Sequence, residues 1–578
     1  MTEHASRPSL PRADGDRSMR GAAVRDGTEG AAVGRLIVAL TLVVAANLHP
    51  RLTPAAAGEG APVPRRFLQL PSIWSDSAVV QRDRPLRIWG RGRPSADVTV
   101  SFATAADEAA GVTATTRADD RGAWRVELPG REASFDRFVL TVRSGDEVIR
   151  LNDILVGDVW LSGGQSNMAL QTQFIVGAER LLAEARHPEI RVFHQETADA
   201  VMAANASRAP VFDVPGGRWL AADAPEGIRR CSGIAYTFAR AVYESLQRTG
   251  HQVPVAVINS AVGGSSINQW IGLETTKHIP ELGGMLPETW RVGADLTGVR
   301  RSCFQPTALY NHKIAPLAPF GLRGVIWLQG ESDAGGGEPG AASYRIALRA
   351  LIEDWRRSFE QPELPFLLLL LHPHAHRVAA DQPERLASLA FFREAQLDVA
   401  GEVPRVVALP THDLPLTWRA PGGPFAYQSP IHPLDKRPSG ERLARAARGL
   451  VYDEPLDYLG PVHVRTTRTG QTLRLTFSHC AGGLAVRDHA AELGGFTLCG
   501  SDRVFAPAEA RIIGKNEVEV RADSVPAPEA VAYGFTAMNQ NANLVNAAGQ
   551  PAAPFRSDRV PSTHLPVFPP ADLRLEPN

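Results

Sequence analysis

Short runs of small, polar and titratable residues follow five apolar segments in the middle of the chain. The runs occupy residues 162–168, 259–266, 329–333, 372–376 and 410–413. They contain the groups that nucleophilic catalysis uses, namely serine hydroxyls, histidine rings, side-chain amides and glycines. Loops are polar in most folds, but five such runs in succession indicate one functional region.

The first run, Ser162-Gly163-Gly164-Gln165-Ser166-Asn167-Met168, has the Gly-x-Ser order of a nucleophile elbow. In such an elbow glycine permits a tight turn from strand to helix, and the turn exposes the serine hydroxyl. Met168 stands where the usual elbow has its second glycine, so the run departs from the standard α/β-hydrolase signature. Ser166 is therefore a candidate nucleophile, and a helix cap is its structural alternative.

A serine nucleophile needs a base to take its proton, and its oxyanion intermediate needs hydrogen-bond donors. Gly264 could present a backbone N–H at close range, and Gln329 could supply an amide donor. The residue types do not choose among the candidate bases, which are His372, His374, His376, His412 and His432. The histidines at 372–376 have no carboxylate nearby to complete a metal site, and we expect no metal or cofactor.

The apolar segments before the polar runs predict the scaffold. They span 154–161, 253–258, 322–328, 366–371 and 405–409, with amphipathic helices expected between them, as at 234–248 and 344–358. Near-continuous apolar strands that alternate with helices indicate a parallel sheet covered on both faces, the α/β class. Because ligands bind beyond the carboxyl ends of parallel strands, we expect the polar runs to meet at one edge.

β-rich segments are expected on both sides of this α/β domain, since 578 residues are too many for one ordinary domain. Short apolar runs separated by turn residues occur at 78–81, 86–89, 98–102, 124–128 and 138–142, as in a small β-sandwich. The pattern returns at 462–464, 473–477, 518–520 and 531–535. We predict an N-terminal region with an export signal at 1–57, domains at 66–150, 151–455 and 456–560, and a tail at 561–578.

An uncharged apolar run at 36–48 follows Arg35 and precedes the small residues Ala55-Ala56-Ala57. This order predicts a secretory signal, because the run is shorter than the roughly 20 residues that span a bilayer. The region before it is long; a start at Met19 would shorten it, and a tail with a chance apolar run is the alternative. We expect a secreted or periplasmic protein without stable membrane insertion after processing.

Charge and cysteine content exclude two further classes. Lys and Arg number 61 against 62 Asp and Glu, a net charge of -1, so no overall basic surface exists for nucleic acid. Four cysteines are too few for a disulfide scaffold, and none forms a C-x-x-C pair. Cys480 and Cys499 could pair across strands in an oxidising compartment or remain buried thiols.

The stretch 158–168 resembles the first block of the sialate O-acetylesterase family, which belongs to the SGNH (GDSL-like) hydrolases. Further similar blocks lie at 261–270, 309–320, 324–333, 393–396 and 431–436, with flanks at 77–81, 89–90 and 554–558. The motifs Gly-Gln-Ser-Asn-Met and Gln-Gly-Glu-Ser, in this order, are specific. The resemblance covers roughly residues 68–560 and implies an SGNH-type, flavodoxin-like parallel sheet with β-sandwich-like domains on either side.

The resemblance also implies roles for individual residues. Ser166 would be the nucleophile and His432 the general base, while the N–H groups of Ser166 and Gly264 and the side chain of Gln329 would form the oxyanion hole. In the family an Asp stands two or three residues before the catalytic histidine, but here those positions are Pro430 and Ser429. Asp413 could take that role, or a backbone carbonyl could orient the ring. Asp435 follows the histidine and is better explained as a cap of a helix at 441–449.

The resemblance implies a secreted serine carbohydrate esterase that removes O-acetyl groups from sugars, with O-acetylated sialic acid as the first candidate substrate. Acetylxylan and acetylated pectin are alternatives, because the named residues contact only the acetyl group that these substrates share. A non-catalytic glycan-binding homologue is the alternative from another class, since the acid residue is missing from its usual position.

Overall fold

The computed structural model describes residues 66–195, 209–283, 305–374, 383–416 and 431–558. Outside these ranges lie the predicted export signal at 36–57, the tail at 561–578, His376, Cys303 and the Ser429–Pro430 pair.

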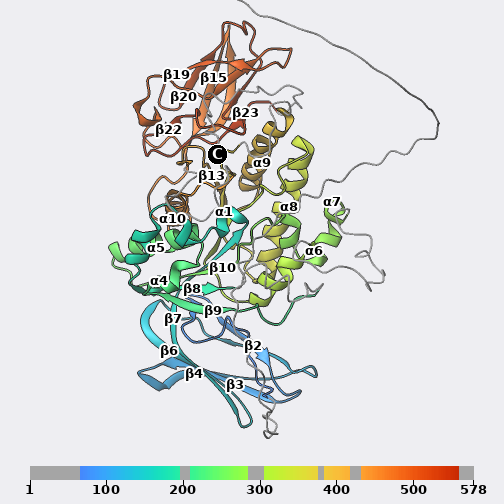
Figure 1. Ribbon diagram of the computed structural model, residues 1–578, viewed down its shortest axis with the longest axis vertical. Coiled ribbons are helices and arrows are strands. Elements are labelled where there is room, and N and C mark those ends of the chain that lie inside the picture. The colour runs from blue at the N-terminus through green and yellow to red at the C-terminus, as the bar shows by residue number, and fades with distance from the viewer. Residues whose placement is uncertain (1–65, 196–208, 284–304, 375–382, 417–430, 559–578) are drawn as a thin grey trace, which may run out of the picture. The chain divides into compact units, whose positions relative to one another are not determined.

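A central mixed sheet runs through the middle of the chain (Figure 1). Its strands are β7 (Glu147–Gly164), β8 (His187–His194), β9 (Arg218–Ala222), β10 (Val255–Asn259), β11 (Gly324–Leu328), β12 (Phe366–Leu369) and β13 (Val406–Leu409). Their order is β13-β12-β11-β7-β10-β8-β9. Neighbours from β13 to β8 pair in parallel, and β9 pairs antiparallel with β8.

The five strands expected from the sequence are β7, β10, β11, β12 and β13. Numbered along the chain they lie in the order 2-1-3-4-5, a doubly wound arrangement. The hairpin of β8 and β9, which the sequence analysis missed, extends the sheet beyond β10. It is hard to recognise because the buried part of β8 includes Arg191, whose guanidinium is paired with Asp153 at 2.8 Å.

Helices cover both faces of the sheet. One face packs against α5 (Gly233–Arg248) and α10 (Arg437–Leu450), the other against α8 (Gly337–Ser358) and α9 (Pro383–Glu402). Along each strand successive side chains alternate between the faces: Trp160 packs with the first pair of helices, and Leu161 packs with the second. The helices expected at 234–248, 344–358 and 441–449 are confirmed, but α8 begins at Gly337.

Short helices and turns connect these elements. The α-helices are α1 (Ser166–Ala169), α2 (Ala178–Ala183), α4 (Pro225–Arg229), α6 (Leu273–His278) and α7 (Pro280–Gly283). The 3₁₀ helices are η1 (Thr172–Phe174), η2 (Ile267–Trp270), η5 (Ala315–Leu317) and η7 (Arg487–His489). One π-helix, η4 (Tyr310–Ile314), is also present in the described ranges.

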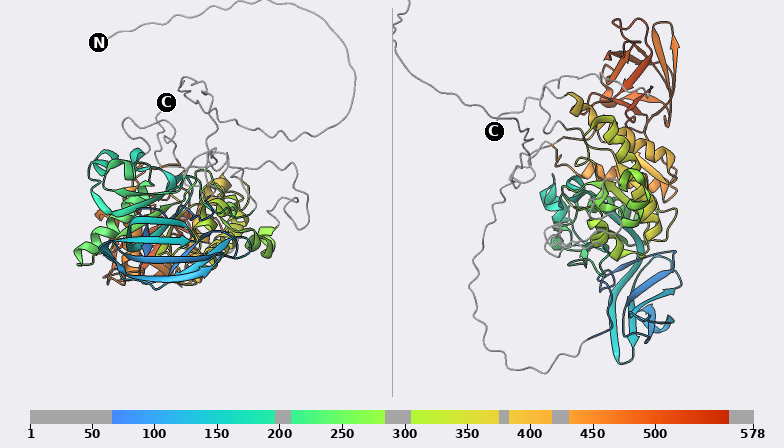
Figure 2. Two further views of the ribbon diagram at one scale, coloured as in Figure 1. Left: turned by 90° about the horizontal axis from the view of Figure 1, so that it is seen from below. Right: turned by 90° about the vertical axis from the view of Figure 1, so that its right-hand side faces the viewer.

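The residues before the central sheet form β1 (Val79–Gln81), β2 (Leu86–Arg91), β3 (Asp97–Thr104), β4 (Asp107–Arg117), β5 (Ala123–Leu128) and β6 (Ser134–Ser144). Figure 2 shows these blue to cyan strands together as one β-rich region, in which β1, β3, β4 and β6 belong to the sheet that continues into β7, and β2 and β5 pair as a separate two-stranded sheet. β7 belongs to both regions, because its first part pairs with β6 and its second part pairs with β10 and β11. The expected boundary at residue 150 therefore lies inside one continuous strand.

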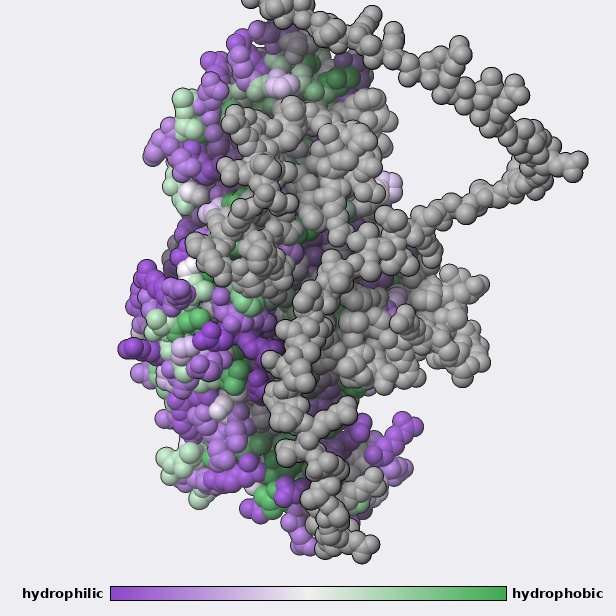
Figure 3. All heavy atoms as spheres, in the orientation of Figure 1, coloured by the Kyte–Doolittle hydropathy of each residue, from purple (hydrophilic) through white to green (hydrophobic). Residues whose placement is uncertain are grey.

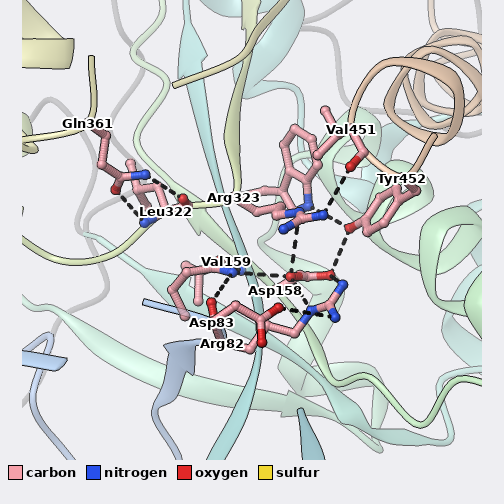
Figure 4. Close-up of polar contacts among 11 residues, drawn as sticks. Arg82, Asp83, Asp158, Val159, Leu322, Arg323, Gln361, Val451 and Tyr452 are labelled. Carbon is pink, nitrogen blue, oxygen red and sulfur yellow. Dashed lines mark hydrogen bonds and ion pairs between the residues drawn. The ribbon is translucent and has the colours of Figure 1, made fainter. Parts of the chain in front are cut away.

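A buried carboxylate ties β7 to segments far away in sequence (Figure 4). Asp158 is completely buried and accepts hydrogen bonds from Arg82 Nε at 2.9 Å and from the Tyr452 hydroxyl at 3.0 Å. The Nε atom of Arg323 lies 3.8 Å from the same carboxylate. These contacts join the N-terminal strands, the central sheet and the segment after α10.

The C-terminal region is also built from strands. They are β14 (Val462–Thr469), β15 (Thr472–Ser478), β16 (Leu484–Val486), β17 (Phe496–Cys499), β18 (Ala506–Pro507), β19 (Glu509–Ile512), β20 (Glu517–Arg521), β21 (Ala530–Tyr533), β22 (Leu544–Asn546) and β23 (Phe555–Arg556). They form sheets β14-β15-β20-β19, β18-β17-β21-β23 and β16-β22 around a shared apolar core. Cys480 and Cys499 are free thiols, so the disulfide considered for them does not form.

On the face that Figure 3 shows, the described surface is mostly hydrophilic, with apolar residues in small scattered groups. None of the helices within the described ranges has the length and apolar character needed to span a bilayer.

Candidate active site

Three of the polar runs contact one another at the carboxyl ends of the parallel strands. Ser260 N–H donates to Ser162 O at 2.9 Å, and Val262 N–H donates to Gly164 O at 2.9 Å, which joins the runs after β7 and β10. Gly330 N–H donates to Gln165 Oε1 at 3.2 Å, which adds the run after β11. The expected meeting of these runs at one edge is confirmed.

The turn that carries Ser166 depends on the two glycines before it. Gly164 has φ of +134°, and a Cβ placed on it would lie 2.0 Å from the Leu328 carbonyl oxygen. A Cβ on Gly163 would lie 2.8 Å from the ring of Trp327. Ser166 is the first residue of α1 and Gln165 is the N-cap, so Ser166 is not the helix cap considered as its alternative. Its half-buried hydroxyl makes no hydrogen bond to a described residue.

The loop after β10 lies against this serine. A Cβ placed on Gly263 would lie 3.7 Å from the Ser166 Cβ, and Gly264 has φ of +71°. Both glycines are exposed. The N–H groups of Ser166 and Gly264 have no hydrogen-bond partner within the described ranges. One backbone donor thus lies on the turn of Ser166 and one on the loop against it, and their expected role as an oxyanion hole stays a prediction.

The amide of Gln329 is engaged with protein groups. Its Nε2 lies 3.0 Å from Ser265 O, 3.2 Å from Gln165 Oε1 and 2.5 Å from Asp333 Oδ2. These acceptors occupy both amide hydrogens, and Gln329 braces the loops around Ser166. To donate to an oxyanion it must exchange one of these bonds, so its expected catalytic role stays a prediction.

Asp333 completes this brace, and the sequence analysis missed it. Its Oδ2 accepts from the N–H of Ile267 at 3.0 Å as well as from Gln329, which fixes the loop containing Gly264. Burial raises the pKa of Asp333 to about 6. The residue could have been found from the sequence as the second acid of the run at 329–333.

A bridge through Asn167 brings the loop of His432 to the nucleophile turn. Asn167 Nδ2 donates to the Ile431 carbonyl oxygen at 3.0 Å, so the residue after Ser166 contacts the residue before His432. Three residues along, Leu434 O accepts from the N–H of Val176 at 3.0 Å. His432 is half-buried.

The other histidines of the described ranges at this edge are more deeply buried. Burial lowers the pKa of His412 to about 3 and that of His372 well below its usual value. His374 is 7% exposed. A base must become a cation when it takes a proton, and burial opposes that charge. This environment favours His432 among the candidate bases whose side chains are described.

Asp413 is held by an arginine. Arg442 Nη1 donates to Oδ1 at 2.6 Å and Arg442 Nη2 donates to Oδ2 at 2.5 Å. Burial opposes ionisation of Asp413, but the bonds and charge of Arg442 outweigh it, and the pKa of the carboxyl is lowered. Its expected role as the acid of the triad stays a prediction. Asp435 lies one residue before the N-cap Lys436 of α10, and its Oδ1 accepts from Arg437 N–H at 3.3 Å.

Two further charged residues reach the site, Glu331 and Lys436. Both contact the side chain of Asn167, at 2.6 Å each. They lie within the blocks that resemble the family, which was the signal that could have found them. Within the described ranges, no group of three or more His, Cys, Asp or Glu residues is arranged to hold a metal ion.

Residues 156–419 match the family model described as carbohydrate esterase, sialic acid-specific acetylesterase, and this match identifies an ester hydrolase of the carbohydrate esterase class. The chain is 26% identical to human sialate O-acetylesterase over 403 residues, covering 65% of this chain and 69% of the human protein. It is 26% identical to the rat sialate O-acetylesterase over 468 residues, covering 73% and 81%.

A solved structure of a carbohydrate acetylesterase from Xanthomonas citri is similar at 33% identity and a TM-score of 0.71, covering 85% of this chain and all of that one. The chain belongs to the sialate O-acetylesterase family of carbohydrate esterases. It is accordingly an esterase that removes O-acetyl groups from carbohydrates.

Proposed function

We propose that the chain is an SGNH-type serine esterase in which Ser166 is the nucleophile and His432 the general base. The observation that carries this proposal is the 3.0 Å bond from Asn167 to Ile431 O, since it joins the residues adjacent to the serine and the histidine. The finer description of the fold, a flavodoxin-like core between β-sandwich-like domains at 66–150 and 456–560, belongs to the same proposal.

In the proposed reaction Ser166 Oγ attacks the acetyl carbonyl carbon while His432 takes the hydroxyl proton. The N–H groups of Ser166 and Gly264 donate to the oxyanion, and Gln329 adds a third donor by releasing Ser265 O or Gln165 Oε1. The intermediate collapses to an acetyl-enzyme, and the histidine gives its proton to the leaving sugar oxygen. His432 then takes a proton from water, the water oxygen attacks the acetyl carbon, and the bond to Ser166 Oγ breaks as His432 returns the proton to that oxygen, which releases acetate and restores the serine.

For the third role of the triad the proposal keeps Asp413, the acid that follows β13. Orientation of the imidazole by a carboxylate holds the correct tautomer and stabilises the cation that forms. The pairing of Asp413 with Arg442 gives this acid a competing structural role. If a backbone carbonyl orients the ring instead, activity will not depend on Asp413.

The proposed substrate is an O-acetylated sialic acid, because the human and rat relatives carry that name. Acetate release should be measured on O-acetylated sialic acid, acetylxylan and acetylated pectin, with Ser166→Ala as the control. Acetate release from O-acetylated sialic acid alone supports sialic acid as the substrate. Acetate release from acetylxylan or acetylated pectin would assign one of these plant polymers as the substrate instead. Binding of a glycan without any acetate release would instead support a glycan-binding protein.

The proposal places the mature protein outside the cytoplasm. Its support is the apolar run at 36–48 followed by the alanines at 55–57. N-terminal sequencing of the protein recovered from the medium or the periplasm tests this. A mature N-terminus close to residue 58 supports export, and an intact leader in a cytoplasmic fraction contradicts it.

A further inference from the structure

The side chain of Asn167 lies between a carboxylate and an ammonium group. Its Nδ2 donates to Glu331 Oε1 at 2.6 Å and to Ile431 O at 3.0 Å. Its Oδ1 accepts from Lys436 Nζ at 2.6 Å. Asn167 and Lys436 are completely buried. The amide therefore lies between the half-buried carboxyl group of Glu331 and the buried amine of Lys436 while also contacting the loop of His432.

The orientation of this amide is set by its neighbours. The peptide carbonyl of Ile431 only accepts, so the nitrogen of the amide must face Ile431, which leaves the amide oxygen to face Lys436. The second oxygen of Glu331, Oε2, is buried and has no hydrogen-bond partner within the described ranges. Among the described residues, Asn167 Nδ2 is therefore the one side-chain group that donates a hydrogen bond to the carboxyl group of Glu331.

Such a cluster is costly to bury. Desolvation lowers the pKa of Lys436 to about 7 and raises the pKa of Glu331, although each charge partly offsets the penalty of the other. Replacement of buried ion pairs by apolar residues is often neutral or stabilising, so fold stability alone does not account for this arrangement. Its position between the serine turn and the histidine loop gives it a different use.

We propose that Glu331 and Lys436 are positioning residues that hold Asn167 so that its amide keeps the loop of His432 against the turn of Ser166. Neither residue contacts the reacting atoms in this scheme. The inference rests on the proposed serine mechanism for its effect on catalysis, but the contact it describes can be tested without activity.

The polarity of the cluster makes an exchange test possible. Asn167→Asp keeps the acceptor for Lys436 but loses the donor to Ile431 O and places two carboxylates together. Adding Glu331→Gln restores one amide to the pair, so that the glutamine introduced by the second change donates to the aspartate introduced by the first. Only the contact with Ile431 O is then lost. The double variant should therefore recover part of what the single variant loses.

On p-nitrophenyl acetate we expect Asn167→Asp to lower kcat by about 100-fold with KM within threefold, the size of a misplacement of about 1 Å. We expect the double variant to regain at least tenfold. A kcat within threefold of the original for Asn167→Asp overturns the proposal, and so does a double variant that regains the full original kcat, because that variant still lacks the contact with Ile431 O. If Asn167→Asp does not fold, Lys436→Gln takes its place, with a tenfold or greater loss of kcat expected and an unchanged kcat overturning the proposal.

Asn546→Asp is the matched control. Asn546 is a buried asparagine whose Nδ2 donates to Leu459 O and His479 O in the C-terminal region, so the change lowers stability there. Its kcat should stay within twofold; an equal loss of kcat there would mean that the Asn167 effect is general instability and would overturn the proposal.

Amide hydrogen exchange separates this proposal from the proposed function. Segment 431–436 should exchange faster in Asn167→Asp than in the original protein, and unchanged exchange overturns the positioning role. If the original protein releases no acetate from any substrate, the serine mechanism fails while the exchange result still decides whether Asn167 holds the loop.

Discussion

The side-chain nitrogen of Gln329 lies 2.5 Å from the Oδ2 oxygen of Asp333, and that oxygen also accepts from Ile267 N–H. One carboxylate thus links the run after β11 to the loop that carries Gly264. Because burial raises its pKa to about 6, this link changes its charge within the range of working pH.

The stability of the protein should therefore fall as pH rises from about 4 to about 6. Asp333 is more readily protonated in the folded chain than in the unfolded chain, so the folded state binds more protons in this window. We expect Asp333→Asn to remove this dependence and to be roughly 1–3 kcal/mol more stable than the original at pH 7, because a tenfold change in proton affinity corresponds to about 1.4 kcal/mol. Urea unfolding at a series of pH values measures the free energy of unfolding of both proteins. Asp523→Asn, at an exposed position, is the control, and parallel profiles for Asp333→Asn and the original would contradict the prediction.

Replacement of Gly164 by alanine should prevent the serine turn from forming. The added Cβ would meet the Leu328 carbonyl at 2.0 Å, at a φ that residues with side chains rarely adopt. A loss of at least about 3 kcal/mol in the free energy of unfolding is expected. Gly401→Ala on α9, where nothing lies within 4 Å of the new Cβ, is the control and should be neutral or slightly stabilising. Equal unfolding midpoints for the two variants would refute this account.

Gln329→Ala should lower kcat on p-nitrophenyl acetate by about 10²–10³-fold, the usual effect of losing one oxyanion donor. Gln361→Ala is a matched control, since Gln361 is also buried and binds the backbone N–H and O of Leu322, which precedes the amino end of β11 (Figure 4). It should lower stability and leave kcat nearly unchanged. If Gln329→Ala behaves like Gln361→Ala, the amide only braces the loops.

Asp413→Asn should lower kcat by about 10⁴-fold if the acid orients His432, because an asparagine there favours the wrong tautomer of the ring. Arg442→Gln removes the observed partner of Asp413 and serves as the comparison. A loss of stability in both variants with kcat retained in both would assign Asp413 to the ion pair alone.

Removal of the Asp158 carboxylate should be among the most damaging changes outside the site. Asp158→Ala leaves Arg82 without its buried partner, and breaking such a pair costs about 3–5 kcal/mol. The exposed pair of Glu108 and Arg150 provides the contrast, since Glu108→Gln should leave the melting temperature unchanged. Thermal unfolding of both variants checks this; equal melting temperatures would count against the role of the buried network.

The sequence by itself determined the local elements of this protein. Apolar runs long enough to be buried on both faces marked the five parallel strands, and the glycines before Ser166 marked a tight turn, because both patterns depend on neighbouring residues. The hairpin of β8 and β9 and the exposed strand β4 escaped, since a buried Arg191 and a run of exposed Ala and Thr do not have a strand pattern.

Only the tertiary structure decided which side chains meet. Asn167 contacts Ile431 and Lys436 across 264 and 269 residues of chain, and Glu331 across 164. Such contacts arise from the packing of α10 and the order of the parallel strands, which no local pattern records. The pairing of Asp413 with Arg442 and the free thiols of Cys480 and Cys499 were settled in the same way, by the distances that packing leaves between residues remote in sequence.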